Sequence, residues 1–382
     1  MKHVYILGAC GSIGVQTLDI VRNNKEQFKV VGISVGRDLN LSKEIINEFN
    51  PQIVCFRHKE HMDEFKEYSF DKCYGDEGLI KVASYSKYDN EILVNALVGS
   101  AGLVPTIEGI KSRKTIALAN KESLVMAGDI INSMLEQNNV ILHPIDSEHS
   151  AIWQCIQGDN IEDIKSLIIT ASGGAFRDKT REELESVTVK EALAHPNWSM
   201  GAKITIDSAT MMNKGFEVIE AHHLFRLPYD KIRTILHRES IIHSMVEYND
   251  LSVKAQMGNP DMRIPIQYAL LYPNHAPHNG EPLDLVKVSK LSFEEIDLNK
   301  YKCLDYAYIC ANKGGLYPVA LNAANEAAVK LFLDGKIKFL DIEKIIEKEI
   351  NKTYLNNNPT IKEILDLNNE IQQRIINEYV GD

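Results

Sequence analysis

Three acidic residues, two of them close together in the sequence and one distant, have the types and settings expected of ligands for a divalent cation. Asp146 and Glu148 directly follow residues 140–145, an apolar run typical of a strand, and parallel α/β sheets present functional residues just beyond their strands. In an extended stretch, residues two apart project to one side, so both carboxylates can reach one ion. Glu217 is the expected third ligand. Oxygen ligation favours Mg²⁺ or Mn²⁺ over Zn²⁺, and a solvated surface acid pair is the competing interpretation.

A second group of polar residues is suited to phosphate. Ser172 ends a buried strand-like run and is followed by two glycines. Ser208 is expected to cap the start of a long helix, with free amide groups behind it. Asn213 and Lys214 lie one to two turns into that helix, where Asn213 shares a face with Glu217. Together these residues offer hydroxyl, amide and ammonium donors to a phosphate. Taken singly, Ser208 also fits a plain cap and Lys214 a solvated charge.

His195 and Trp198 lie in a turn-like segment, His-Pro-Asn-Trp. An indole on a loop is a costly exposure unless it covers something. We therefore interpret the segment as a lid that excludes water from a bound substrate, with packing of Trp198 on its own domain as an equal alternative. His243 lies in a strand pattern and is expected to be a hydrogen-bonded core histidine. Lys121 fits either a substrate contact or a solvated charge.

The glycines of the segment Gly-Ala-Cys-Gly-Ser-Ile-Gly, Gly8, Gly11 and Gly14, follow the first strand-like run and open a helix. Glycines let a backbone approach a pyrophosphate, and a helix N-terminus favours the anion. This position predicts a dinucleotide-binding loop. Arg37, at the end of the second strand, favours NADP over NAD because an arginine accommodates the 2′-phosphate. The adjacent Asp38 weakens that choice, and an exposed loop arginine is an equally good interpretation of Arg37.

Length, composition and net charge limit the classes of function that the chain can have. A chain of 382 residues exceeds one ordinary core, and its 25% charged and 44% apolar residues are ordinary for a globular protein. A formal net charge of -11 argues against nucleic acid as a partner. The six cysteines form no Cys-x-x-Cys pair, so they are expected to be buried free thiols. The chain enters a strand at once, which leaves no room for a signal peptide, and no run has membrane-spanning length. We expect a cytoplasmic protein without membrane contact.

The hydrophobic pattern predicts an α/β protein with three parts. An N-terminal Rossmann-like, doubly wound sheet precedes a central α+β catalytic domain and a C-terminal α-helical bundle. In the first part, the predicted strands are Val4–Leu7, Val30–Val35, Ile53–Phe56, Leu93–Val98, Thr115–Leu118 and Val140–Ile145, with helices at Leu41–Phe49 and Ser123–Gln137. In the second, we expect a strand at Ser166–Ala171, a helix at Ser208–Phe225, and an antiparallel meander of Thr234–Leu236, Ile241–Glu247 and Ser252–Gln256. The expected bundle helices are Leu304–Asn312, Val319–Leu333, Ile342–Asn351 and Ile361–Tyr379.

The corresponding domain boundaries follow from these patterns. They are 1–150 for the dinucleotide-binding domain, 151–273 for the α+β catalytic domain, 274–290 for a linker and 291–382 for the bundle.

Several segments together resemble the 1-deoxy-D-xylulose 5-phosphate reductoisomerase family. The most specific matches are Asp-Ser-Glu-His-Ser and Asn-Lys-Gly-Phe-Glu-Val-Ile-Glu-Ala. The bundle fits by layout rather than by motif. The matching segments are Gly8–Gly14, Ala117–Leu124, Ile145–Gln154, Ala171–Phe176, His195–Phe225, Ser240–Met245 and Gly258–Pro265.

The resemblance implies a two-stage reaction of the non-mevalonate isoprenoid pathway. A chelated hydroxyketone phosphate is rearranged to an aldehyde by retro-aldol cleavage and re-addition, and NADPH then reduces the aldehyde to 2-C-methyl-D-erythritol 4-phosphate. It also implies that residues 1–150 form an NADPH-binding domain and that 151–273 form a catalytic and dimerisation domain of a homodimer. The implied substrate is a phosphorylated ketose, and the implied cofactor besides NADPH is a divalent cation, Mn²⁺ or Mg²⁺, with Co²⁺ as a further option. The cation stabilises enolate-like charge, and the phosphate grip positions the substrate.

The resemblance assigns roles residue by residue. It places Asp146, Glu148 and Glu217 on the metal, and His195 and Trp198 over the substrate. The implied catalytic residues are Lys121, Glu148, His195 and Trp198. The implied substrate contacts are Lys121, Ser147, Glu148, Ser172, His195, Ser208, Asn213, Lys214 and Glu217. The implied cofactor contacts are Ala9, Cys10, Gly11, Ser12, Ile13, Gly36, Arg37, Asp38, Asn120, Glu122, Gly201 and Met262.

This chain departs from the family pattern at three places. Ala9 and Cys10 stand where the family loop commonly has Ser and Thr, Arg238 and Glu239 stand where Pro and Gln are common, and Asp38 stands where an amide is common. Two other functions compete. A semialdehyde- or homoserine-type NADP dehydrogenase would not need a three-carboxylate metal site, and a non-catalytic NADP sensor would not need Glu217.

Overall fold

The computed structural model describes residues 1–380, and these divide into two compact units, each interrupted in sequence. The second unit takes the stretches between and after those of the first. The three domains and the linker predicted from the sequence stay a prediction. The first unit comprises Met1–Ser123, Asp129–Ser150 and Asp261–Asn279.

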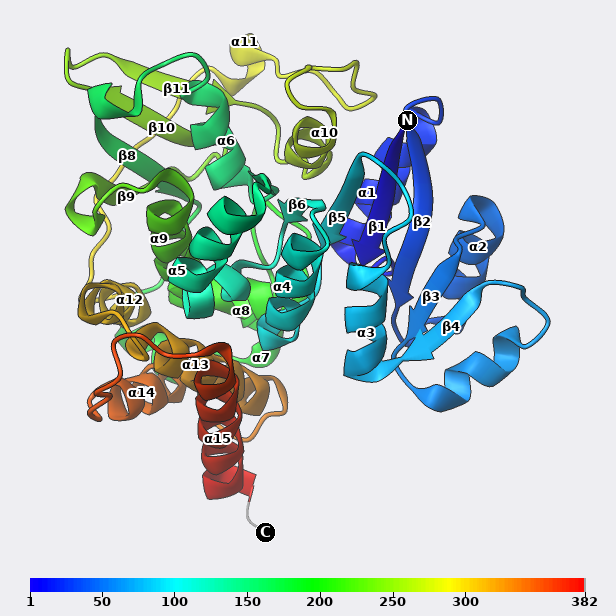
Figure 1. The fold of residues 1–382 in the computed structure, drawn as a ribbon. Helices are drawn as coiled ribbons and strands as arrows, with labels where there is room; N and C mark the ends of the chain where they lie inside the picture. The colour runs from blue at the N-terminus through cyan, green and yellow to red at the C-terminus, as the bar shows by residue number, and fades with distance from the viewer. Residues whose placement is uncertain (381–382) are drawn as a thin grey trace. The chain divides into compact units, whose positions relative to one another are not determined.

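The first unit is built on a seven-stranded sheet in which all paired strands are parallel. The order β4-β3-β2-β1-β5-β6-β7 shows that the chain starts in the centre and winds outward in both directions, so the doubly wound α/β prediction is confirmed. The strands are β1 (Lys2–Leu7), β2 (Phe28–Val35), β3 (Ile53–Phe56), β4 (Asp71–Tyr74), β5 (Glu91–Asn95), β6 (Thr115–Leu118) and β7 (Leu142–Pro144), of which β1 to β6 are labelled in Figure 1.

Helices cover this sheet, which explains why its central strands are apolar without alternation. Val4, Ile6 and Val94 have no exposed surface. The core of the unit joins such residues to apolar side chains of the helices. The helices that lie wholly or partly in the unit are α1 (Ser12–Asn23), α2 (Leu39–Phe49), α3 (Gly75–Ser84), α4 (Leu103–Lys111), α5 (Lys121–Asn138), α6 (Ser147–Cys155) and α10 (Arg263–Leu271).

The sequence pattern locates six of the seven strands of this sheet and misses β4. Its four residues, Asp-Lys-Cys-Tyr, carry no β-branched side chain, and only Cys73 among them is buried. β4 is an edge strand whose pairing with β3 comes from the tertiary structure rather than from local preference.

The second unit contains a four-stranded sheet of order β11-β10-β8-β9. β10 pairs antiparallel with β11 and β8, whereas β9 pairs parallel with β8. The predicted three-strand meander is therefore wrong in one respect. β8 lies between β9 and β10, because the chain leaves β9 by a turn that crosses the end of β8. The strands are β8 (Ile164–Ala171), β9 (Ile232–Leu236), β10 (Ile242–Tyr248) and β11 (Val253–Met257).

The single helix predicted over Ser208–Phe225 is also wrong. The structure has two helices, α8 (Ala202–Thr210) and α9 (Met212–Phe225), separated at Met211, whose φ of 63° is left-handed and ends α8. Apolar residues continue through the break, so hydrophobic periodicity alone does not reveal it.

α9 is enclosed between the sheet and the helical bundle. Val218 and Ala221 pack with β8 and β9, whereas Phe216 and Ile219 belong to the core formed with the bundle. Gly215 allows the close approach of α12, since a Cβ there would lie 2.4 Å from the Cβ of Ala307. This double burial fixes the helix that carries three predicted site residues.

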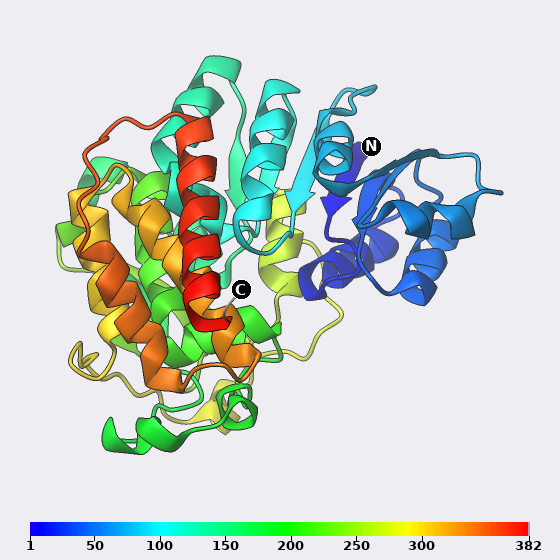
Figure 2. The same cartoon turned by 90° about the horizontal axis from the view of Figure 1, so that it is seen from below.

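The helical bundle predicted for the C-terminal region is confirmed, as Figure 2 shows in gold to red. α13 packs against α12, α14 and α15, and its alanines form much of the shared core. The preceding segment contains the short α11 (Leu285–Val288). No helix between residues 1 and 380 is long and apolar enough to cross a membrane. The bundle helices are α12 (Lys302–Lys313), α13 (Tyr317–Leu333), α14 (Phe339–Ile350) and α15 (Ile361–Val380).

Candidate active site

The glycine loop joins β1 to α1 in a conformation that only glycines permit. Gly8 has a φ of +87°, and a Cβ at Gly14 would lie 2.2 Å from the carbonyl oxygen of Gly8. Ser34 of β2 holds the loop by accepting a hydrogen bond from the amide of Gly8, at 2.8 Å. Within the described residues, no side chain caps the N-terminus of α1. Such a terminus suits a phosphate anion.

The other residues of the loop differ in exposure. Ala9 is fully buried, and the Cys10 sulfur lies 3.4 Å from the hydroxyl of Ser42 on α2. Gly11 and Ser12 are exposed, and Ile13 is half-buried. The small side chains at positions 9 and 10 thus face the protein and leave the backbone of the loop accessible.

Asp38 has a structural role that the sequence did not suggest. Its side chain caps α2 by accepting a hydrogen bond from the amide of Leu41, at 3.0 Å. Arg37 is exposed, and the space around the Cα of Gly36 is open. The Asp38 carboxylate is therefore engaged by the helix that it caps.

Asn120 is the N-cap of α5, and its side chain is fully engaged. Its Oδ1 accepts from the amide of Ser123 at 3.1 Å, and its Nδ2 donates to the carbonyl of Gly99 at 2.8 Å and to Glu122 at 3.1 Å. Any cofactor contact of Asn120 would therefore use its backbone.

Asp146 and Glu148 lie at the start of α6, directly after β7. The extended stretch expected for them is wrong, because Ser147–Cys155 is helical. The helix nevertheless brings the two carboxylates together, with ligand oxygens within 4.8 Å of each other. Ser147 fixes both, since its amide donates to Asp146 at 3.2 Å and its hydroxyl donates to Glu148 at 2.7 Å.

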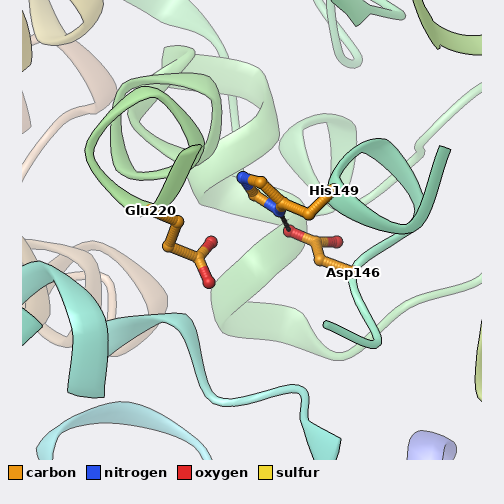
Figure 3. Close-up of side chains that lie close together, drawn as sticks. All are labelled: Asp146, His149 and Glu220. Atoms are coloured by element: carbon orange, nitrogen blue, oxygen red, sulfur yellow. Dashed lines mark ion pairs between the residues drawn. The ribbon is translucent and has the colours of Figure 1, made fainter. Parts of the chain in front are cut away.

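Two basic side chains hold Asp146. The Lys121 ammonium lies 3.0 Å from its Oδ2, and Nδ1 of the fully buried His149 lies 3.6 Å from the same atom; Figure 3 marks the latter contact. Burial alone would raise the pKa of Asp146, but the charge of Lys121 and the contact with His149 outweigh it and hold the pKa far below its ordinary value. The carboxylate is therefore ionised, as a metal ligand must be.

Ser172 and His195 form a direct contact in the second unit. Nδ1 of His195 accepts hydrogen bonds from the amides of Asn197 at 3.2 Å and Trp198 at 3.0 Å. The proton of the neutral ring is therefore on Nε2, which donates to the Ser172 hydroxyl at 3.0 Å. The turn that begins at His195 is thus folded onto the end of β8.

The pKa of His195 gives a prediction for stability. Burial, assisted by the charge of Arg177, lowers this pKa from 6.5 to about 4. Between these values the unfolded chain binds more protons at His195 than the native chain does. The stability contributed by the neutral ring is therefore complete above pH 6.5 and is lost as the pH falls toward 4.

We subtract the free energy of unfolding of His195→Gln from that of the wild type. We expect this difference to decrease as the pH is lowered from 6.5 to 4. Chemical denaturation at several pH values measures the difference. A difference that stays constant would mean that His195 has an ordinary pKa in the native protein.

Asn213, Lys214 and Glu217 form a connected group on α9. The amide of Asn213 donates to Oε1 of Glu217 at 2.5 Å, and the Lys214 ammonium pairs with its Oε2. Glu217 has no exposed surface. Asn213 and Lys214 lie in the first turn of α9, closer to its start than predicted, because the helix begins at Met212.

Ser208 is half-buried in the last turn of α8, so its predicted role as an N-cap is wrong. It nevertheless lies beside the glycines that follow Ser172, since a Cβ at Gly174 would lie 2.5 Å from the carbonyl oxygen of Ser208. The structure therefore brings Ser172, Ser208 and His195 into one region by a different local structure from the expected one.

Trp198 packs against His243 of β10, with ring centroids 6.0 Å apart. Gly201 is the N-cap of α8, and Met262 is that of α10, where it packs against the core of the first unit. The cofactor roles expected for Gly201 and Met262 stay predictions.

Two residues beside the predicted site were not predicted. His149 contacts Asp146, and Arg177 contacts the turn that contains His195. His149 lies within the quoted Asp-Ser-Glu-His-Ser motif, one helical turn from Asp146, so its position was a usable signal. Arg177 lies in a polar stretch that offers none.

The parallel sheet and the glycine loop after its first strand place the first unit in the class of dinucleotide-binding α/β folds. Three family models match the chain. They describe 1-deoxy-D-xylulose 5-phosphate reductoisomerase over residues 4–128, its C-terminal domain over 142–225, and the DXP reductoisomerase C-terminal domain over 257–374.

Curated relatives and solved structures agree. The reductoisomerase of Geobacillus sp. (strain WCH70) is 52% identical over 379 residues, covering 98% of this chain and 99% of its own length. That of Macrococcus caseolyticus is 52% identical over 374 residues, with the same coverage. The Zymomonas mobilis enzyme in complex with NADPH superposes with a TM-score of 0.90 at 37% identity, and a DOX-P reductoisomerase in complex with NADPH, fosmidomycin and magnesium with 0.92 at 39%. Each pair of chains is covered completely. The chain therefore belongs to the 1-deoxy-D-xylulose 5-phosphate reductoisomerase family.

Proposed function

We propose that this protein converts 1-deoxy-D-xylulose 5-phosphate into 2-C-methyl-D-erythritol 4-phosphate, with NADPH as reductant and a divalent cation as cofactor. The observation that carries the proposal is the set of three carboxylates predicted from the sequence. Asp146, Glu148 and Glu217 form one of two groups of residues, within 1–380, whose ligand atoms are close enough to hold one metal ion. The dehydrogenase and sensor alternatives do not require this group.

The donor chemistry fits the cation. All three ligands are carboxylate oxygens, which Mg²⁺ and Mn²⁺ prefer, and Asp146 is held ionised by its neighbours. When bound, the cation supplies electrophilic stabilisation of the negative charge that develops on the substrate oxygens. Lys121 and Ser147 hold the carboxylates in place and face the substrate in the proposed complex.

The second group of possible ligands is Asp146, His149 and Glu220. It shares Asp146 but includes an imidazole, and nitrogen ligation shifts preference toward Zn²⁺. We assign the catalytic cation to the all-carboxylate group, because three carboxylates suit Mg²⁺ or Mn²⁺ and because the family resemblance implies Asp146, Glu148 and Glu217 as the ligands.

Ser172, Ser208, Asn213 and Lys214 are proposed to bind the substrate phosphate. Their donors are hydroxyls, an amide and an ammonium, which together match a phosphate dianion. His195 and Trp198 are proposed to close over the bound substrate, so that the aldehyde formed in the first stage stays bound and dry until it is reduced.

The glycine loop is proposed to bind NADPH, because its backbone has the shape needed to approach a pyrophosphate. A Cβ at Gly8 or Gly14 would collide with the backbone, so the loop keeps a cradle of the kind that accepts a pyrophosphate. The remaining proposed contacts come from Gly36, Arg37, Asp38, Asn120, Glu122, Gly201 and Met262.

Arg37→Ala is expected to raise the Kd for NADPH about tenfold, the loss of one charge-assisted contact to the 2′-phosphate. The Kd for NADH, which lacks that phosphate, should not change. Fluorescence titration of both nucleotides measures the effect, and Arg57→Ala provides a control at another exposed arginine of the first unit. Equal changes for NADPH and NADH would remove the assignment of Arg37.

The activity is tested by following NADPH absorbance after addition of 1-deoxy-D-xylulose 5-phosphate, with Mn²⁺, with Mg²⁺ and after exhaustive chelation. Oxidation that requires both the substrate and a cation is expected, and fosmidomycin should inhibit it. NADPH oxidation that survives chelation would favour the dehydrogenase alternative. A complete lack of turnover with cation present would leave the sensor alternative.

We further propose a homodimer that acts in the cytoplasm. The second unit exposes apolar side chains beside the free edge of its sheet, with Leu251 67% and Val253 50% exposed, and Val286 on α11 is 88% exposed. Exposed apolar side chains near an open sheet edge are suited to a subunit contact. Light scattering coupled to size-exclusion chromatography tests the dimer, and a monomer at micromolar concentration would contradict it.

A further inference from the structure

One guanidinium nitrogen joins three separate segments of the second unit. Nη1 of Arg177 donates to the carbonyl of Arg238 at 3.0 Å, to Oδ1 of Asn197 at 3.3 Å and, more weakly, to the carbonyl of Ser172 at 3.4 Å. Ser172 ends β8, Asn197 lies in the turn that begins at His195, and Arg238 follows β9. We call residues 195–198 the flap segment.

The flap segment closes a ring of hydrogen bonds around this arginine. The Asn197 amide donates to the same Arg238 carbonyl at 3.1 Å, and its backbone amide donates to His195 at 3.2 Å. His195 in turn contacts the Ser172 hydroxyl at 3.0 Å. Arg177 therefore contacts both ends of the path from Ser172 through the flap segment to the turn after β9.

Contacts of its side chain and backbone fix the position of Arg177. A Cβ at Gly173 would lie 2.8 Å from the Cβ of Arg177, so glycine is needed to admit the side chain. The Lys300 ammonium donates to the Arg177 carbonyl at 2.8 Å. The nearest carboxylate is that of Asp178, 3.7 Å away, and it is bound more closely by Arg238, at 2.5 Å.

We propose that Arg177 is a positioning residue that holds the flap segment against Ser172 and adds positive charge beside the phosphate-binding donors. The inference rests on the proposed function, because it takes Ser172 as a phosphate ligand. A neutral hydrogen-bonding residue could supply the geometry, whereas the charge accounts for the choice of arginine. The lowered pKa of His195, to which the charge of Arg177 contributes, agrees with this placement.

The test compares Arg177→Met with Arg181→Met in the complete protein. Arg181 is a matched control, since it pairs with Glu343 and lies in the same unit outside the proposed site. Arg177→Met is expected to raise both the KM for 1-deoxy-D-xylulose 5-phosphate and the inhibition constant of fosmidomycin about tenfold or more, the effect of losing charge-assisted contacts. The Kd for NADPH should stay unchanged, and so should all three constants in Arg181→Met.

A second pair of measurements separates positioning from general destabilisation. In a Trp153→Phe background, Trp198 is the only tryptophan, and its fluorescence should shift in Arg177→Met but not in Arg181→Met. Arg177→Lys keeps the charge and loses the planar fork, so it should show an intermediate KM. It also serves as the test if the methionine variant folds poorly.

Coupling to the flap segment is measured by a double-mutant cycle with Asn197→Ala. Arg177→Met and Asn197→Ala should be less than additive in their effects on KM, because both break the same path. Wild-type substrate and fosmidomycin constants in Arg177→Met and in Arg177→Lys would overturn the inference while the wild type remains active. An inactive wild type would instead contradict the proposed function.

Discussion

Replacing Glu148 by glutamine is expected to lower kcat about 1,000-fold or more, while the Kd for NADPH stays within about twofold. A cation that stabilises developing charge contributes several kcal/mol, and about 1.4 kcal/mol corresponds to a factor of ten in rate. The amide keeps the size of Glu148 and can still accept the hydrogen bond from Ser147. The amide lacks the negative charge, so the variant alters the metal ligand while the local fold is preserved.

The measurement combines steady-state kinetics with Mn²⁺ binding followed by electron paramagnetic resonance. Glu108→Gln is the control, because Glu108 is a carboxylate of the same unit that pairs with the exposed Lys111. The control should keep wild-type kcat and Mn²⁺ affinity. Unchanged turnover in Glu148→Gln would remove Glu148 from the metal site. Turnover that falls without any loss of Mn²⁺ affinity would assign it a different catalytic role.

Most strands of the first unit could be predicted because each is an apolar run that can be recognised without knowing its partner strand. Val30–Val35 and Ile53–Phe56 are apolar runs bounded by polar turns, and helices bury both faces of the sheet. β4 could not be predicted in this way, because an edge strand of four mainly polar residues depends on its partner, β3. The order of the second sheet also depends on long-range pairing, which places β8 between two strands that are neighbours in sequence.

The types of the candidate site residues were easier to predict than their local structure. The sequence predicts Asp146 and Glu148 as a pair on one face of an extended segment, yet the first turn of α6 is what brings them together. The sequence predicts Ser208 to be the cap that starts a helix, yet the structure places it in the last turn of α8. In both cases the prediction rests on the chemistry of the side chains and on the family resemblance, and neither depends on where a helix begins or ends. The residues around the site, such as Arg177, act through contacts with distant carbonyls that no local pattern encodes.

The two possible ligand groups use different glutamates of α9, Glu217 in one and Glu220 in the other. Glu217 and Glu220 are three residues apart and therefore neighbours on the helix surface, and both are buried, with 0% and 4% of their surface exposed. Glu217 is bound by Asn213 and Lys214, the proposed phosphate donors, so it connects the proposed metal and phosphate sites. This connection favours Glu217 as the ligand of the catalytic cation.

Glu217→Gln is therefore expected to weaken Mn²⁺ binding about 100-fold and to lower kcat about 1,000-fold, the same range as for Glu148→Gln. Glu220→Gln, a change of the same kind one helical turn away, should leave both within about tenfold of the wild type. The effects of Glu148→Gln and Glu217→Gln on kcat should not add, since both carboxylates are proposed to hold the same cation and therefore act as one unit. If Glu220→Gln instead shows the larger loss of Mn²⁺ affinity, the cation site is the group that contains His149. A preference for Zn²⁺ over Mn²⁺ would then be expected, because an imidazole replaces one carboxylate.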